Sequence, residues 1–191
     1  MKIAYSILEE HLKVCSQTRK VLEAKLEALF LGIQEGLSAS RMMIFFGNGG
    51  SAADAQHFAA EMIGKLTRHR DPIPAIALTT DTSIITAVAN DYSINDIFWR
   101  QVHALGQPGD VLVALSTSGN SKNVVKAVNT AKEKQMQTIA LLGKGGGDLA
   151  AMVDVALVVP SQISQRIQEA HIAVIHTWCE LIEDVLHPKQ E

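Results

Sequence analysis

The sequence predicts an α/β domain in which a five-stranded, largely parallel sheet lies between helices as a three-layer sandwich. Five short apolar segments, bounded by Gly, Pro, Ser or Asp and without polar alternation, are typical of strands buried on both faces, as in parallel sheets. Segments with helical periodicity separate most of them. Long helical segments open and close the chain. This order of elements is typical of the α/β class.

The chain opens with a predicted helix, or two helices in succession, between residues 4 and 37. Apolar side chains recur there at steps of three, four and seven residues, which places them on one face of a helix. These side chains are Leu8, Leu12, Cys15, Leu22, Leu26, Leu29, Ile33 and Leu37. We expect this amphipathic helix and the apolar last helix to form interfaces between subunits.

Strands and helices then alternate. The predicted strands are 42–46, 75–78, 110–116, 138–143 and 155–160, and the predicted helices are 51–66, 93–105, 120–135, 147–152 and 164–187. Pro188 cannot continue a helix and is expected to end the last one. The 191 residues indicate a single domain. It comprises an N-terminal helical segment (1–40), an α/β core (41–162) and a C-terminal helix (163–191).

Charge and cysteine content exclude several functions. A formal net charge of −3, with scattered lysines and arginines, argues against a nucleic-acid-binding surface. The densest basic stretch, residues 65–70 (KLTRHR), is expected to be a solvated loop. Cys15 and Cys179 lie outside any metal-binding pattern, so we expect reduced thiols and a cytoplasmic protein. No apolar run approaches about 18 residues, and we expect no membrane span.

The stretch FFGNGGSAADAQHF (45–58) joins a predicted strand to a predicted helix, where ligands of α/β sheets bind. Gly47, Gly49 and Ala52 match the G-x-G-x-x-G/A spacing of dinucleotide folds. The acidic residue that should follow about 20 residues later is missing, because Asp81 lies much farther along. No Gly-Lys-Ser/Thr of a phosphate-binding Walker loop is present either. The dinucleotide and Walker interpretations are therefore disfavoured.

A more general role remains for this glycine loop. Asn48, Gly49 and Gly50 allow backbone N–H groups to approach a polar ligand closely, and Ser51 is placed to cap the helix. The alternative is a tight strand-to-helix turn without a ligand.

A second candidate loop, STSGNS (116–121), follows the predicted strand 110–116. Its four hydroxyl groups and a glycine at a helix N-terminus offer O–H and N–H donors to a phosphate. No lysine or Mg²⁺-binding aspartate accompanies them, which favours a phosphomonoester over a triphosphate. The alternative is a capping cluster in which Ser116 or Ser118 only satisfies backbone amides.

Two predicted helices carry residues that can transfer protons or bind a metal. His57 and Glu61 stand four residues apart and so share a helix face. The last helix carries Gln168, Glu169, His171 and His176. A histidine with a carboxylate can act as an acid/base pair, and histidine, glutamate and an amide can ligate a divalent metal. Helix geometry does not decide whether His171 or His176 accompanies Gln168.

Five stretches together resemble one known family. GNGGSAADAQHFAAE, ANDYSINDIF, GDVLVALSTSGNSKNVVKA, LLGKGGGDLA and RIQEAHIAVIH stand in the order found in the phosphoheptose isomerases, which belong to the sugar isomerase (SIS) family. The resemblance covers about residues 42–186. It implies a flavodoxin-like SIS fold and a homotetramer with active sites shared between subunits. It also implies conversion of sedoheptulose 7-phosphate to D-glycero-D-manno-heptose 7-phosphate, for the heptose of the lipopolysaccharide core.

The same resemblance implies roles for individual residues. The sugar would be bound by Asn48, Gly49, Gly50, Ser51, Asn90 and Asp91, with contacts from Glu61 and Gln168, and the phosphate by Ser116, Thr117, Ser118 and Ser121. One zinc ion per subunit would be held by His57, Glu61, Gln168 and His176. Glu61 and His176 would be the acid/base pair, which selects His176 over His171. Glu61 is assigned to the carbon proton and His176 to the oxygens, although the reverse is possible.

The chain departs from the family at one position. The family often has Gly-Arg where this chain has Gly64 and Lys65, and lysine lacks the bidentate geometry of arginine. Asp54, Gln56 and Asp81 receive no role.

A non-catalytic relative provides the main alternative. This SIS-fold tetramer binds the replication initiator protein and shares much of the helix after the glycine loop. It lacks the carboxylate and the last histidine at the positions of Glu61 and His176, and both are present here. Other sugar-phosphate isomerases or sensing domains of the SIS family would keep the serine-rich loop without the four metal-site residues. The isomerase is the favoured interpretation.

Overall fold

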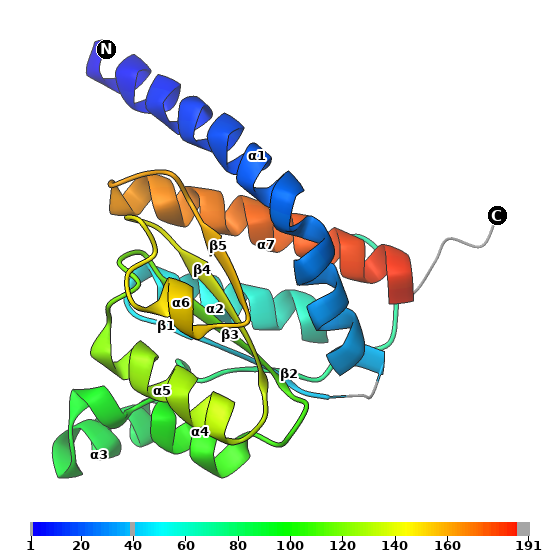
Figure 1. Ribbon diagram of the computed structural model, residues 1–191, viewed down its shortest axis with the longest axis vertical. Coiled ribbons are helices and arrows are strands. Elements are labelled where there is room, and N and C mark those ends of the chain that lie inside the picture. The colour runs from blue at the N-terminus through cyan, green and yellow to red at the C-terminus, as the bar shows by residue number, and fades with distance from the viewer. Residues whose placement is uncertain (1, 39–40, 187–191) are drawn as a thin grey trace.

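The computed structural model describes residues 2–38 and 41–186 and contains one parallel sheet (Figure 1). Its strands lie in the order β2-β1-β3-β4-β5. They are β1 (Met43–Gly47), β2 (Ala75–Ala77), β3 (Val111–Ser116), β4 (Gln137–Leu142) and β5 (Val155–Val158). The predicted five-stranded α/β class is confirmed. Pro188 and the side chains of Leu26, Leu29, Ile33 and Leu37 lie outside the described part.

The helices follow the predicted alternation with two differences, the additional α3 and the division of the segment 93–105. They are α1 (Lys2–Ser38), α2 (Gly50–Ile63), α3 (Thr82–Asp91), the 3₁₀ turn η1 (Ile94–Asp96), α4 (Trp99–Leu105), α5 (Lys122–Glu133), α6 (Leu149–Met152) and α7 (Ser164–Leu186). The first segment is one helix, and α3 was not predicted. The predicted helix 93–105 was wrong as a single element, since buried Ile97 and Phe98 separate η1 from α4.

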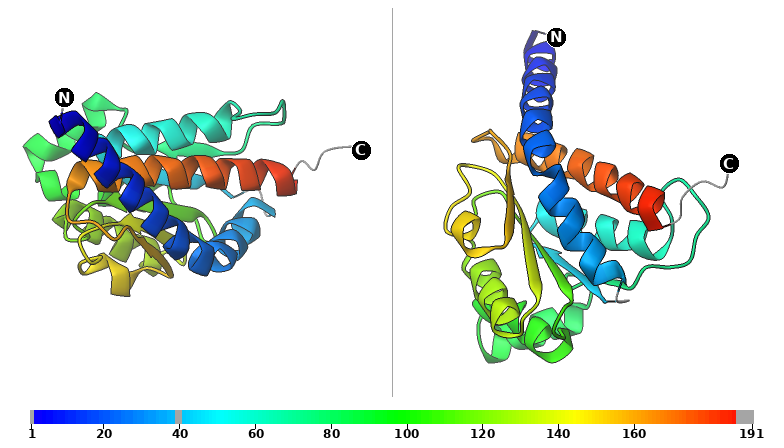
Figure 2. Two further views of the ribbon diagram at one scale, coloured as in Figure 1. Left: turned by 90° about the horizontal axis from the view of Figure 1, so that it is seen from above. Right: turned by 45° about the vertical axis from the view of Figure 1, so that its right-hand side comes forward.

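Successive strand residues point into two different apolar cores, as the pleat of a strand requires. Met43 and Phe45 join a core with α1, α2 and α7, whereas Ile44 and Phe46 join a second core with α4 and α5. Figure 2 shows the sheet nearly edge-on between these two helical layers. Burial on both faces explains why the strands read as unbroken apolar runs.

The N-terminal end of α1 extends beyond the rest of the protein (Figures 1 and 2). Ile3, Tyr5, Leu8 and Leu12 are exposed there, while Val14 and Thr18 farther along the helix are buried. The helix therefore covers the core from about Val14 onward and leaves an apolar surface on its first turns. None of the described helices is long and apolar enough to cross a bilayer.

Candidate functional site

The two predicted ligand loops lie side by side, because they follow adjacent strands. Gly47 at the end of β1 pairs with Leu115 of β3. A Cβ atom on Gly47 would lie 2.7 Å from the carbonyl oxygen of Leu115, so only glycine allows this approach. Gly49 has a φ of 57° and serves as the N-cap of α2. The expected capping role of Ser51 is wrong, since the helix begins at Gly50 and Ser51 is buried within its first turn.

The serine-rich loop lies between β3 and α5. The hydroxyl of Ser116 accepts a hydrogen bond from the Gly119 N–H and lies 3.4 Å from the hydroxyl of Ser121. The hydroxyl of Ser118 accepts from the Asn120 N–H. Ser121 is the N-cap residue of α5 but makes no capping bond with its side chain. Part of this loop is therefore engaged in capping its own backbone, and the Ser121 hydroxyl is available at the N-terminus of a twelve-residue helix.

A pair of asparagines joins the two loops. Each side-chain amide of Asn48 and Asn123 donates to the carbonyl oxygen of the other, at 2.9 Å in both directions. Asn123 is buried in the first turn of α5. Asn123 was not among the predicted site residues, although it stands only two residues after Ser121. The pairing fixes the orientation of the Asn48 carboxamide beside the serine-rich loop.

Three of the predicted metal-site residues converge. His57 and Glu61 project from α2, and His176 projects from α7, which packs against α2. The Nε2 atom of His57 lies 2.9 Å from Nε2 of His176 and 3.5 Å from Oε1 of Glu61. One ligand atom from each of the three residues lies within 4.8 Å of the others. Spacing along a single helix accounts for the first two residues, and tertiary packing supplies the third.

This cluster has the chemistry of a metal site. Two imidazole nitrogens and a carboxylate oxygen form a ligand set that catalytic zinc sites use, with another position open for water or substrate. His57 is half-exposed, and Glu61 is more enclosed. The donor atoms are therefore close enough and accessible enough to hold one divalent ion.

The other polar residues of α7 take different positions. The side chain of Gln168 packs against Gly50, where an added Cβ would lie 2.5 Å from its Nε2 atom. His171 is fully buried and its Nε2 atom lies 3.1 Å from the Leu142 carbonyl oxygen. Burial lowers the pKa of His171 to about 4, despite that hydrogen bond. Glu169 pairs with His11 of α1 at 2.7 Å. His171 therefore belongs to the core, and His176 belongs to the cluster.

Asp54 lies one helical turn before His57. Its side chain is largely buried, and its Oδ2 atom has no hydrogen-bond partner among the described residues. Burial raises the pKa of its carboxyl to about 6, and nearby His57 opposes this rise. Asp54 is therefore a buried carboxyl next to the candidate site. The spacing of residues in the sequence did not indicate this position.

Asn90 and Asp91, which were predicted to bind the sugar, lie apart from the cluster. Asn90 and Asp91 end α3, whose apolar residues pack with the layer of α4 and α5, on the other face of the sheet from α2 and α7. The Asn90 amide donates to the Asp91 carboxylate. Asp81 caps α3 by accepting from the Ile84 N–H, and the Gln56 amide lies 3.2 Å from the Thr79 hydroxyl. The structure thus does not bring Asn90 and Asp91 to the cluster within one chain.

The basic stretch 65–70 is not simply a solvated loop. Lys65 is exposed, but the side chain of Arg70 is fully buried and forms an ion pair with Glu183 at 3.2 Å. The expectation of a solvated loop was wrong for this arginine, because its buried partner is 113 residues away in the sequence. The sequence did not indicate that Glu183 is the partner of Arg70, because Glu183 is one of several charged residues in the last helix.

Comparisons with known proteins agree on one family. The sequence pattern of the SIS domain matches residues 8–143. A phosphoheptose isomerase from Geotalea daltonii is 48% identical over 178 residues, covering 93% of this chain and 93% of the relative. One from Geobacter sulfurreducens is 51% identical, covering 89% of this chain and 94% of the relative. The solved structure of a phosphoheptose isomerase from Neisseria gonorrhoeae matches with a TM-score of 0.90 at 44% identity, covering 96% and 98% of the two chains.

Proposed function

Because this chain belongs to the SIS domain family, in the group of the phosphoheptose isomerases, we propose that it converts sedoheptulose 7-phosphate to D-glycero-D-manno-heptose 7-phosphate. The observation that carries the proposal is the convergence of Glu61 with His57 and His176 within 4.8 Å. A carboxylate and an imidazole at one site provide the two proton-transfer groups that an aldose–ketose interconversion needs. The product is suited to synthesis of the lipopolysaccharide core heptose.

The reaction moves protons and leaves the carbon chain intact. The Glu61 carboxylate takes the proton from C1 of the ketose, and the electron pair forms the C1–C2 double bond of an enediol. His176 carries a proton from the O1 hydroxyl to O2. The Glu61 carboxyl then returns its proton to C2 while the C1 carbonyl forms. The substrate and these two side chains supply every proton and electron pair that the interconversion needs.

The serine-rich loop is the proposed anchor for the phosphate. Ser116, Thr117, Ser118 and Ser121 surround the N-terminus of α5, where hydroxyl and backbone N–H donors favour an anion. The glycine loop beside it, with Asn48 held by Asn123, is the proposed contact for the sugar hydroxyls. Anchoring the phosphate limits the positions that C1 and C2 can take relative to Glu61.

The proposed cofactor is one zinc ion per subunit, held by His57, Glu61 and His176 with Gln168 as a further ligand. Metal ligation and proton transfer by Glu61 and His176 would belong to different states of the site. When bound, zinc supplies Lewis acidity that polarises the substrate carbonyl. The ligand set of two histidines and a glutamate supports zinc over magnesium or calcium, which prefer oxygen ligands.

The proposed assembly is a homotetramer whose active sites are shared between subunits. The exposed apolar surface on the first half of α1 supports an interface there. Asn90 and Asp91, which lie away from the cluster within one chain, would then reach the site of a neighbouring subunit. A cytoplasmic location is supported by two free cysteines, one of them fully buried.

Binding of a replication initiator without catalysis is not favoured. The residues that such a relative lacks, Glu61 and His176, are both part of the cluster. Relatives at about 50% identity carry the isomerase name.

The test is proton NMR of sedoheptulose 7-phosphate incubated with the purified protein in D₂O, with and without added Zn²⁺. A new aldose signal that disappears with the Glu61→Gln variant is the expected result. Absence of turnover in both conditions, from protein shown to be folded by circular dichroism, would reject the isomerase and direct attention to the initiator protein.

A further inference from the structure

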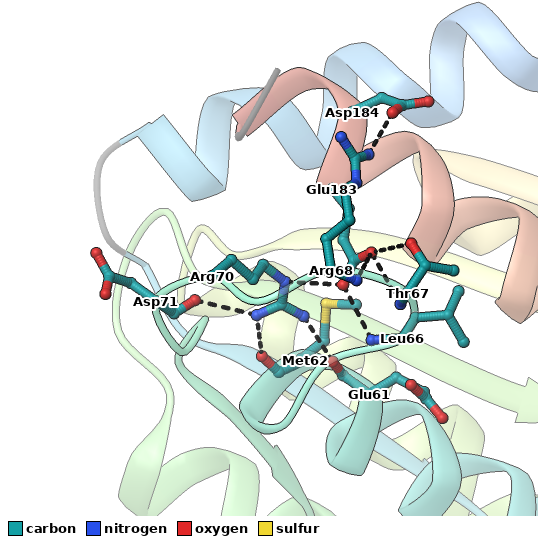
Figure 3. Close-up of polar contacts among 9 residues, drawn as sticks. All are labelled: Glu61, Met62, Leu66, Thr67, Arg68, Arg70, Asp71, Glu183 and Asp184. Atoms are coloured by element: carbon teal, nitrogen blue, oxygen red, sulfur yellow. Dashed lines mark hydrogen bonds and ion pairs between the residues drawn. The ribbon is translucent and has the colours of Figure 1, made fainter. Parts of the chain in front are cut away.

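The Glu183 carboxylate lies at a buried junction between α7 and the loop that follows α2 (Figure 3). Oε1 accepts from the Leu66 N–H at 2.9 Å and the Arg70 guanidinium at 3.2 Å. Oε2 accepts from the Thr67 N–H at 3.1 Å, the Thr67 hydroxyl at 2.7 Å and the Arg68 N–H at 3.3 Å. Three successive backbone N–H groups thus surround one carboxylate, as they surround anions in backbone nests.

The same junction continues into α2 through Arg70. Its guanidinium donates to the carbonyl oxygens of Glu61 at 2.6 Å and Met62 at 2.8 Å. These carbonyls belong to the last turn of α2 and have no partner within the helix. Arg70 therefore links the end of α2 to Glu183 of α7, and one of the two α2 carbonyls that it holds belongs to Glu61.

The junction and the candidate site share a helix face. His176 and Glu183 are seven residues apart on α7, which is two turns and nearly the same direction. A displacement of α7 along or around its axis would move both residues together. The hydrogen bonds of Glu183 therefore hold the same face of α7 that carries His176, two turns from it.

We infer that Glu183 and Arg70 are positioning residues, which set the register of α7 on α2 and hold Glu61 and His176 at their working separation. This inference rests on the proposed function, because the working separation is that of the proposed acid/base pair and metal ligands. Neither residue touches the reacting atoms. The junction also orders the loop that begins with Lys65.

The electrostatics of the junction favour a permanent charge on Glu183. Burial is the largest influence and acts to raise the pKa of this carboxyl. Hydrogen bonds from Thr67 and Leu66 and the charge of Arg70 outweigh burial and lower the pKa to about 2. The ion pair persists at neutral pH, so the register does not depend on a proton.

Glu183→Gln keeps the shape of the side chain and removes its charge, and Thr67→Val removes one hydroxyl bond while keeping the ion pair. Thr67→Ser retains that hydroxyl and is the matched control. Asp110→Asn is a second control, because Asp110 is also a buried carboxylate that accepts backbone N–H bonds, but its donors, Met42 and Gln107, lie outside α2 and α7.

Three quantities are measured for each variant below its melting temperature: the Zn²⁺ dissociation constant by competition with a chromogenic chelator, kcat, and KM. We expect Glu183→Gln to lower kcat by about tenfold or more and to weaken Zn²⁺ binding by about tenfold, with KM within about twofold, because misplacement affects the reacting groups more than the phosphate anchor. Thr67→Val should change kcat and Zn²⁺ affinity in the same direction by a smaller factor. Thr67→Ser and Asp110→Asn should match the wild type in both.

The outcomes separate this inference from the proposed function. If the wild type turns over the substrate and Glu183→Gln loses only thermal stability, as Asp110→Asn does, the positioning role is overturned and the function stands. If the wild type binds Zn²⁺ but does not isomerise the substrate, the function fails, and weaker Zn²⁺ binding by Glu183→Gln still supports the register. If Glu183→Gln does not fold, Thr67→Val decides, and wild-type kcat and Zn²⁺ affinity in that variant reject the inference.

Discussion

The Nε2 atoms of His57 and His176 lie 2.9 Å apart, although 119 residues separate them in the sequence. Two imidazoles at this distance share one proton as a hydrogen bond, with one nitrogen as donor and the other as acceptor. A bound metal would take the place of that proton. The pair therefore marks the point where α2 and α7 together form a site that neither helix forms alone.

Glu61→Gln should abolish most of the isomerase activity. The amide cannot accept the carbon proton, and loss of a general base costs about 10²–10⁴-fold in kcat. Steady-state kinetics with sedoheptulose 7-phosphate measure this effect, with the melting temperature as the control for folding. A Glu61→Gln enzyme within about tenfold of wild-type kcat would assign the carbon proton to another group.

His57→Asn should weaken Zn²⁺ binding by more than about 100-fold, because it removes a residue that contacts the metal directly. Replacing a residue that only hydrogen-bonds to a metal ligand already lowers metal affinity by about 10–100-fold. The measurement is competition with a chelator at equilibrium. His171→Gln is the matched control, because His171 is a histidine of α7 that faces the Leu142 carbonyl oxygen in the core and not the cluster. Equal Zn²⁺ affinity in wild type and His57→Asn would remove His57 from the metal site.

Ser121→Ala should raise KM by about ten- to a hundredfold and leave kcat nearly unchanged. The hydroxyl of Ser121 makes no capping bond and lies 3.4 Å from the Ser116 hydroxyl, so it can turn to donate to a phosphate. A hydrogen bond to a charged group contributes about 1.5–3 kcal/mol. Inhibition by inorganic phosphate should weaken in parallel. An unchanged KM together with unchanged phosphate inhibition would show that the phosphate binds elsewhere.

His171 should make the folded protein less stable in acid. Its pKa is about 4 when folded and 6.5 in the unfolded chain, so between these values the unfolded state binds more protons. Its contribution to the free energy of unfolding is present above pH 6.5 and is lost as the pH falls to about 4.

Asp54 changes the free energy of unfolding in the opposite direction to His171, over nearly the same pH range. Its folded pKa of about 6 lies above the ordinary 3.8, so its contribution falls as the pH rises between these values. Urea unfolding at a series of pH values and one protein concentration separates the two. His171→Gln should lower the slope of stability against pH by up to about 1.4 kcal/mol per pH unit, and Asp54→Asn should raise the slope. Parallel curves for all three proteins would contradict both assignments.

Replacing Leu8 and Leu12 by glutamate should dissociate the assembly. Both side chains are largely exposed within one chain, at 59% and 67%, on the part of α1 that extends from the fold. Sedimentation equilibrium should report a lower mass, and activity should fall with it if subunits share their sites. Glu133→Lys, a change at an exposed residue in the last turn of α5, is the control and should keep the wild-type mass. A wild-type monomer would reject the tetramer.

Much of the fold could be predicted from local pattern. Apolar runs such as MMIFF predicted strands, because a strand that is buried on both faces needs apolar side chains at every position. The order of strands and helices predicted the α/β class. The unpredicted α3 has no fully buried residue, and its partly buried Ile85, Val88 and Ala89 form only a short apolar stripe that the prediction did not use. The pairing of His57 with Glu61 followed from helix periodicity alone.

The sequence by itself therefore determined the strands, the two ligand loops and the residues available for chemistry, because each depends on neighbours within a few positions. Only the tertiary structure decided which of them meet. It placed His171 in the core and His176 beside His57, and it buried Arg70 against Glu183. The physical reason is that such contacts depend on how α2 and α7 pack, and that packing results from the whole core and not from any local pattern.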